Sequence, residues 1–198
     1  MRQVLLIFVR NPVLGKVKTR LASTVGNDEA LRIYHLLLEK TRQAALGCQA
    51  ERWLFYSHFA DASDLWPNEY FHKKVQSPGD LGARMAAAFE QAFGDGATRV
   101  AIIGSDCPEL DGDLLNRAFD ALNEADGVLG PANDGGYYLL GVKKMHPELF
   151  LDMPWSTESV GSETLKRMAA KGLSVHFLPE LTDVDTEEDW RLYGQKMV

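Results

Sequence analysis

Short apolar runs alternate with amphipathic stretches along this chain, and that order limits the folds open to it. The run Val4–Val9 is apolar at every position, as expected of a strand buried on both faces. The other predicted strands are Trp53–Tyr56, Val100–Gly104, Val128–Leu129, Tyr137–Val142 and Ser174–Leu178. Repeated strand-then-helix order predicts an α/β fold, a three-layer α/β/α sandwich around a mostly parallel sheet. The Gly-rich turn before Tyr137 indicates an antiparallel pair, so the sheet is expected to be mixed.

Helical stripes and capping residues fill the intervals between these strands. The predicted helices are 30–45 after a capping Asn27 or Asp28, 81–93 after Asp80 with an end at Gly94, 111 to about 125, 159–170, and a last helix that opens with the capping box Thr186 and Asp189. In such folds ligands bind beyond the carboxyl ends of the strands, where the connecting loops meet.

Composition narrows the class of protein. The 198 residues fit one domain, which we expect to span 1–198, and 45% of them are hydrophobic, enough for a full core. The net charge of −7 argues against a general nucleic-acid surface, and no apolar run approaches the length that spans a bilayer. Arg10 and the cations after it stand where a signal peptide would need small residues, and two cysteines are too few for a disulfide framework. The sequence therefore predicts a cytoplasmic protein.

A basic segment follows the first strand. Residues 1–27 contain five basic side chains and no acidic one, and the loop holds Arg10, Gly15, Lys16, Lys18 and Arg20. Cations offset the charge of a polyphosphate, and glycine lets backbone N–H groups approach its oxygens. In an extended stretch, the three cations from Lys16 to Arg20 would alternate and point to one side. The loop matches neither a Walker A motif nor a dinucleotide fingerprint, and the alternative is a solvated basic loop.

Three aspartates are candidates for a metal site. Asp106 follows the strand Val100–Gly104, where a carboxylate is costly unless it is paired, hydrogen-bonded or bound to a metal. Mg²⁺ or Mn²⁺ would be its natural partner beside phosphate oxygens, but an Asp that caps its own turn is an equal alternative. Asp183 and Asp185 could complete the site, although an Asp before a helix is also an ordinary cap.

Two further segments carry candidate binding residues. The turn before the strand Tyr137–Val142 holds Asp134, Gly135, Gly136 and Tyr137, which could bind a ring-shaped acceptor or simply form a hairpin with core tyrosines. The helix start at Gly79 and Arg84 is either an anion-contacting N-terminus or a helix cap with an incidental arginine. The five histidines are scattered without ligand spacing, and we interpret them as structural.

Six segments, in one order from about Val4 to Trp190, resemble a known family. They are P-V-L-G-K-V-K-T-R-L, G-D-L-G-A-R-M, I-G-S-D-C-P, G-P-A-N-D-G-G-Y-Y-L-L-G, P-W-S-T and D-V-D-T-E-E-D-W. The chain resembles the glycosyltransferase-A-like nucleotide-diphospho-sugar transferases, also known as radical-SAM/selenodomain-associated transferase 1. Leu14 and Glu187 stand where the family pattern has proline, and Ser77-Pro78 precedes Gly79 in a less usual form; no charged group is lost.

The resemblance implies a glycosyltransferase-A fold and a metal-dependent transferase that uses a nucleotide-diphosphate-sugar donor. By similarity Lys16, Lys18 and Arg20 bind phosphates, Asp106 with Asp183 or Asp185 holds Mg²⁺ or Mn²⁺, and the turn from Asp134 to Tyr138 faces the acceptor. Asp106 and Asp134 are thus the expected catalytic residues.

Two other functions stay open at this point. A nucleotidyltransferase of the guanylyltransferase kind would release pyrophosphate instead of a nucleoside diphosphate, and a non-catalytic nucleotide-binding module would release neither. The expected partners are a nucleotide or nucleotide sugar and a small acceptor. The base, the sugar, the acceptor and the oligomeric state are not indicated by the sequence.

Overall fold

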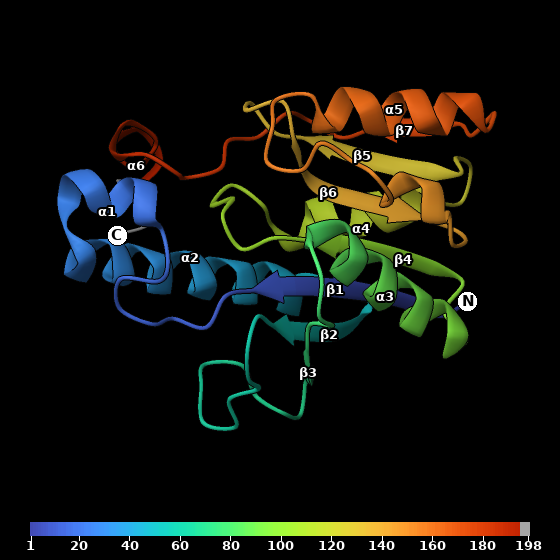
Figure 1. The fold of residues 1–198 in the computed structure, drawn as a ribbon. Coiled ribbons are helices and arrows are strands. Elements are labelled where there is room, and N and C mark those ends of the chain that lie inside the picture. Colours follow the sequence, from blue (N-terminus) through green and yellow to red (C-terminus); the bar gives the residue numbers. More distant parts are fainter. Residues whose placement is uncertain (195–198) are drawn as a thin grey trace.

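The computed structural model describes residues 1–194, and a single seven-stranded sheet runs through them (Figure 1). The strands lie in the order β3-β2-β1-β4-β6-β5-β7. Their bounds are β1 Gln3–Val9, β2 Glu51–Tyr56, β3 His72–Val75, β4 Arg99–Ile103, β5 Gly127–Pro131, β6 Tyr137–Val142 and β7 Val175–Phe177. Strand β6 runs antiparallel to β4 and β5, and every other neighbouring pair is parallel. The predicted mixed, mostly parallel sheet is confirmed.

Helices cover both faces of this sheet. They are α1 Thr19–Val25, α2 Asn27–Gly47, α3 Leu81–Gly94, α4 Gly112–Ala121, α5 Val160–Ala170 and α6 Glu187–Tyr193, with a 3₁₀ turn at Pro147–Leu149. Alternate residues of β1 enter two different cores: Leu5 and Ile7 pack with α2 and α4, whereas Val4 and Leu6 pack with α3 and α5. Each such side chain contributes roughly 1.5–3 kcal/mol of burial free energy. The three-layer sandwich is therefore confirmed.

A third, smaller core joins α1, α2 and the segment before α6. It contains Leu21, Ile33, Leu37 and Val184, with Trp190 of α6 packed against it. This core places α6 beside α1, the helix that follows the basic loop after β1 (Figure 1).

The capping predictions hold at three helices. The side chains of Asp80 and Asp111 accept the backbone N–H groups of Ala83 and Leu114 at 2.8 and 2.7 Å. Thr186 and Asp189 form the predicted capping box of α6. The cap of α2 was assigned to the wrong residue, since Gly26, at φ 86°, occupies that position and frees the chain to turn between α1 and α2.

The sequence did not predict α1, β3 or the 3₁₀ turn at Pro147–Leu149, and α4 is shorter than predicted. Helix α1 lies where an extended loop was expected, and β3 is a short edge strand, His72–Val75, with little apolar pattern to reveal it. Helix α4 ends at Ala121, because residues 122–125 form a tight turn. None of the helices in residues 1–194 is long and apolar enough to cross a membrane. That residues 1–198 form one domain stays a prediction.

Candidate active site

Two adjoining cavities lie at the carboxyl ends of β1, β4 and β5. The larger has a volume of about 1290 Å³ and the smaller about 640 Å³. They share a boundary made of Phe8, Arg20, Leu81, Gly104, Asp106, Ser156 and Asp185. This position agrees with the rule that open α/β sheets bind ligands beyond the carboxyl ends of their strands.

Lys18 bridges two of the boundary carboxylates. Its Nζ atom lies 2.8 Å from Oδ1 of Asp106 and 2.9 Å from Oδ1 of Asp185. The lysine side chain is only 5% exposed, whereas the two carboxylates remain 42% and 41% exposed. Burial acts to lower the pKa of Lys18, but the two carboxylates outweigh it and the pKa is raised. Lys18 is therefore a resident cation of the site.

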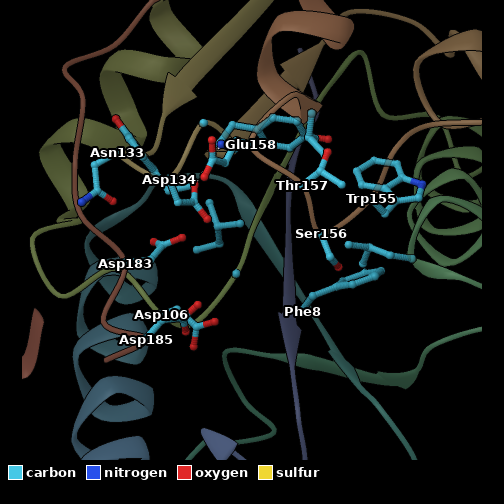
Figure 2. Close-up of a pocket in the computed structure, with 18 of the residues that line it drawn as sticks. Phe8, Asp106, Asn133, Asp134, Trp155, Ser156, Thr157, Glu158, Asp183 and Asp185 are labelled. Atoms are coloured by element: carbon cyan, nitrogen blue, oxygen red, sulfur yellow. Dashed lines mark hydrogen bonds between the residues drawn. The ribbon is translucent and has the colours of Figure 1, made fainter. Parts of the chain in front are cut away.

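Asp183 forms no ion pair with any of the described residues, unlike Asp106 and Asp185. Burial, followed by the negative charges of Asp106 and Asp134, raises its pKa to about 7, and Lys18 only partly opposes that shift. Figure 2 shows Asp106 and Asp185 together at one end of the larger cavity, with Asp183 and Asp134 beyond them. Negative charge is thus concentrated at this point and only partly compensated.

Backbone hydrogen bonds hold the segments that carry these carboxylates. The Val184 N–H donates to the Asp106 carbonyl at 2.9 Å, which places 183–185 against the end of β4. Beyond β7 the chain continues beside β5, where Leu181 N–H donates to Pro131 O and Asn133 N–H donates to Leu181 O, each at 3.1 Å. Backbone hydrogen bonds therefore hold the loops that carry the aspartates against one another and against the end of β5.

The carboxylates of Asp106, Asp183 and Asp185 are the candidate ligands of a divalent cation. Their donors are oxygen atoms only, the chemistry that Mg²⁺ and Mn²⁺ prefer. Asp106, Asp183 and Asp185 fit such an ion in donor type. In residues 1–194, however, no three acidic, His or Cys side chains form a ready-made ligand set, and Lys18 bridges Asp106 and Asp185.

The turn between β5 and β6 is held against the start of α5. Oδ1 of Asp134 accepts the Gly136 N–H at 2.8 Å, and the Gly161 N–H donates to Gly135 O at 3.0 Å. Gly135 has φ 85°, and a Cβ atom there would lie 2.2 Å from the Glu158 carbonyl oxygen. Only glycine fits this position, which fixes Asp134 at the wall of the larger cavity.

Trp155 forms an aromatic wall of the larger cavity. A Cβ at Gly82 of α3 would lie 2.5 Å from its Nε1 atom and 2.3 Å from Phe150 O, so the indole needs glycine at that point. The Tyr137 hydroxyl is buried in the same cavity wall beside Thr164, but no described residue gives it hydrogen-bond geometry. Burial raises the pKa of Tyr137.

The smaller cavity is lined by cations and by residues that tie the strand ends together. Arg10 and Arg84 belong to it alone, whereas Arg20 belongs to both cavities. Arg20 is 75% exposed, and its Nη1 atom lies 3.6 Å from Oδ2 of Asp185. The Tyr34 hydroxyl donates to the Arg10 carbonyl at 3.0 Å and lies 3.4 Å from the Ser105 hydroxyl. Burial raises the pKa of Tyr34 to about 12, so this hydroxyl stays neutral.

Comparison with known proteins places the chain in a family. A family model described as "Uncharacterized protein conserved in bacteria (DUF2064)" matches residues 40–157, more than half of the chain. A crystal structure from Desulfovibrio desulfuricans G20, provisionally named a nucleotide-diphospho-sugar transferase, is 36% identical with a TM-score of 0.85, over 94% of this chain and 84% of that one. The chain belongs to the DUF2064 family.

More distant structures share the fold of this DUF2064 protein. Rv0371c of Mycobacterium tuberculosis H37Rv, solved with manganese, is 15% identical with a TM-score of 0.60 over 98% of both chains. A CMP:2-keto-3-deoxy-manno-octonic acid synthetase solved with CTP is 11% identical with a TM-score of 0.57, over 99% of this chain and 100% of that one. No curated protein matches. The resemblance to nucleotide-diphospho-sugar transferases and the enzyme class of transferase are thereby confirmed.

The structure of this DUF2064 protein brings most of the predicted residues together. Those that line one or both cavities are Arg10, Lys18, Arg20, Arg84, Asp106, Asp134, Gly135, Gly136, Tyr137, Asp183 and Asp185. Gly15, Lys16 and Gly79 line neither cavity, which departs from the expected phosphate site. Their functional roles stay predictions.

The reason for this departure is the local backbone of the basic loop. Residues 13–16 form a turn, closed by Lys16 N–H to Val13 O at 2.9 Å, and Lys16 is exposed. Lys18 follows as the N-cap residue of α1 and adopts the left-handed backbone conformation, with φ 46°. The alternation assumed for an extended stretch is therefore wrong, and Lys16 does not share a direction with Lys18 and Arg20.

Sequence reasoning also missed two polar residues at the ends of β1 and β2, of which Gln76 lines the smaller cavity and Asn11 lines neither. Asn11 is 4% exposed; its Nδ2 donates to Phe59 O at 2.8 Å and its Oδ1 accepts the His58 N–H at 3.0 Å. Gln76 makes comparable contacts between the ends of β1 and β2. A polar residue directly after a buried strand was the available signal for Asn11. Cys107 is buried and its pKa is raised to about 12, so the interpretation of a non-nucleophilic thiol agrees with its environment.

Proposed function

We propose that this DUF2064 protein transfers a sugar from a nucleotide-diphosphate-sugar donor to a small acceptor, across the boundary of its two cavities. The observation that carries the proposal is the meeting of the two cavities at Arg20 and Asp106. One side is lined by cations and the other by carboxylates and aromatic rings. A transferase needs two substrates whose reacting atoms meet, and adjoining cavities of different chemistry provide that arrangement.

The smaller cavity is assigned to the donor nucleotide. Its volume of about 640 Å³ lies within the ordinary range of about 300–1,000 Å³ for small-molecule sites. Arg10 and Arg84 can offset phosphate charge there, and Arg20 can contact a diphosphate at the boundary. A donor in this position presents its sugar to the larger cavity.

A divalent cation, Mg²⁺ or Mn²⁺, would be held by Asp106, Asp183 and Asp185 together with diphosphate oxygens. When bound, it would stabilise the negative charge of the departing nucleoside diphosphate. The manganese in the Rv0371c structure is consistent with this assignment. When no metal ion is bound, Lys18 keeps Asp106 and Asp185 close together and limits the repulsion between them.

Asp134 is assigned to the acceptor. Its carboxylate lines the larger cavity and is fixed by the Gly136 N–H, so it can orient an acceptor hydroxyl and take its proton. In the transfer step the acceptor oxygen forms a bond to the anomeric carbon as the bond from that carbon to the phosphate oxygen breaks. The nucleoside diphosphate leaves with the electron pair, and Arg20 offsets its charge.

Nucleotidyl transfer is the second candidate. The synthetase solved with CTP shares this fold, and the same cavities would accept a nucleoside triphosphate, with attack at the α-phosphate and release of pyrophosphate. A cytoplasmic location is proposed with either chemistry, since both draw on nucleotide pools of the cell.

The test is to supply nucleotide sugars and nucleoside triphosphates with Mg²⁺ or Mn²⁺ and an acceptor panel, and to follow phosphorus products by ³¹P NMR. Free nucleoside diphosphate supports sugar transfer, whereas pyrophosphate supports nucleotidyl transfer. Asp134→Asn serves as the matched control, because background hydrolysis of a donor would survive in that variant. Tight nucleotide binding without either product would favour the non-catalytic module.

A further inference from the structure

Charge is divided unequally between the two cavities. The smaller one is lined by Arg10, Lys18, Arg20 and Arg84. The larger one shares Arg20 at the boundary, but the described residues that line it alone include Asp134, Glu158 and Asp183 and no Lys, Arg or His. The charged side chains that line only the acceptor half are therefore all acidic, whereas those that line only the donor half are all basic.

The acidic side chains of the acceptor half lack cationic partners. Lys18 and Arg20 pair with the boundary carboxylates Asp106 and Asp185, and no ion pair among the described residues involves Asp134 or Glu158. Neutralisation of Asp183 by a metal would leave Asp134 and Glu158 uncompensated.

Aromatic and apolar groups form other parts of the same cavity wall. Trp155 is held against Gly82, while Phe8 and Met85 line the cavity as well. Figure 2 shows Trp155 and Phe8 apart from the aspartates, so that the cavity has an apolar region and an acidic region. An aromatic wall of this kind fits the face of a ring.

From these features we infer that the acceptor is an uncharged or amine-bearing hydroxyl compound with a ring that packs on Trp155, and that phosphate esters and carboxylates are excluded. The inference rests on the proposed function, in which this cavity is the acceptor half. An anion there would face the negative charges of Asp134 and Glu158, which are both exposed, whereas an ammonium or hydroxyl group can donate hydrogen bonds to them.

The inference can be tested with two matched sets of probes. The pyranose set is glucose, glucosamine and glucose 6-phosphate, and the aromatic set is tyrosol, tyramine and 4-hydroxyphenylacetate. Binding to the full chain is measured by saturation-transfer NMR, and a signal counts only if it is lost in Trp155→Ala. We expect the neutral and amine members to bind at least about tenfold more tightly than the anionic member of each set. Equal or tighter binding of the anionic members overturns the inference, and so does the lack of any Trp155-dependent signal.

A charge reversal tests whether probe affinity depends on the charge inside the cavity or on the net negative charge of the whole protein. Glu158→Lys should raise the affinity for glucose 6-phosphate and lower that for glucosamine. Glu124→Lys is the matched control, because Glu124 is exposed and lines neither cavity. If Glu158→Lys and Glu124→Lys change the affinities for glucose 6-phosphate and glucosamine equally, the inference is wrong. Nucleotide binding is measured separately by thermal shift. A failure of the proposed nucleotide site can therefore be distinguished from a failure of the inference about the acceptor.

Discussion

The Nζ atom of Lys18 lies 2.8 Å from Oδ1 of Asp106, and the lysine side chain is almost fully buried while the aspartate is not. A basic residue that looked like a surface phosphate ligand is thus an internal counter-ion at the boundary of the two cavities. Its second contact, to Asp185, joins the end of β4 to the segment before α6. Lys18 therefore contributes both to the stability of this region and to the charge that a substrate meets.

Replacement of Lys18 should destabilise the protein when no metal is present. Lys18→Met keeps most of the apolar stem but removes the cation that Asp106 and Asp185 share, which leaves only the exposed Arg20 near Asp185. We expect a loss of about 1–3 kcal/mol in the free energy of unfolding, less than for a fully buried pair because both carboxylates are partly exposed. Urea unfolding measures this, and Mg²⁺ should restore more stability to the variant than to the wild type.

Lys16→Met is the control for that experiment, since Lys16 is exposed and lines neither cavity. Its effect should stay within about 0.5 kcal/mol. Similar losses in both variants would show that the ion pairs of Lys18 contribute nothing measurable.

Asp183 predicts a pH dependence of stability. Its pKa of about 7 in the folded protein is above the value of roughly 3.9 expected in the unfolded chain. A carboxyl group whose pKa is raised on folding favours the folded state below about pH 4 and loses that contribution as pH rises through about 7. Asp183→Asn should therefore raise the free energy of unfolding at pH 8 by about 2–4 kcal/mol in the presence of EDTA, and by little at pH 4.

The measurement is urea unfolding of wild type and variant from pH 4 to pH 8. A gain that does not change with pH would contradict a raised pKa at Asp183. Added Mg²⁺ should narrow the difference in the free energy of unfolding between variant and wild type at pH 8. A bound cation would offset the charge of the wild-type carboxylate, whereas the amide of the variant carries no charge to offset. A residue that costs stability in the absence of ligand is expected at a functional site.

The glycine turn gives a prediction from backbone geometry. Gly135→Ala would place a Cβ 2.2 Å from the Glu158 carbonyl oxygen at φ 85°, so the turn must move. We expect a loss of about 1–3 kcal/mol in stability and impaired transfer, because Asp134 is displaced. Gly94→Ala is the control: it meets open space at the end of α3 and should leave stability unchanged or slightly increased. An equal effect of both changes on transfer would argue against a positioned Asp134.

Much of the fold could be predicted because its signals are local. Val4–Val9 and Val100–Gly104 are apolar at nearly every position, which is sufficient to identify buried strands. Since the carboxyl ends of parallel strands meet at one edge, the position of Asp106 near the basic loop followed from their order alone. The edge strand β3 gave no comparable signal, because it carries charged side chains and is only half-buried.

Those parts of the site that depend on long-range contacts could not be predicted. The pairing of Lys18 with Asp185 joins residues 167 positions apart, and no local pattern distinguishes it from a phosphate contact. Glu158 and Trp155 acquire their place in the cavity only when the start of α5 packs against the glycine turn. Helix α1 was missed because the basic residues before it suggested an extended loop.

The final prediction separates the donor half of the site from the acceptor half. Asp134→Asn retains an oxygen that can accept the Gly136 N–H, so the turn should persist while the proton acceptor is lost. We expect a fall in turnover of about 10²–10⁴-fold with little change in nucleotide affinity. Asp106→Asn removes a boundary carboxylate that pairs with Lys18, so it should weaken metal-dependent nucleotide binding and turnover together. Isothermal titration gives the affinities, and product release gives the rates. If Asp134→Asn weakens nucleotide binding as much as Asp106→Asn does, the assignment of the two cavities to donor and acceptor is wrong.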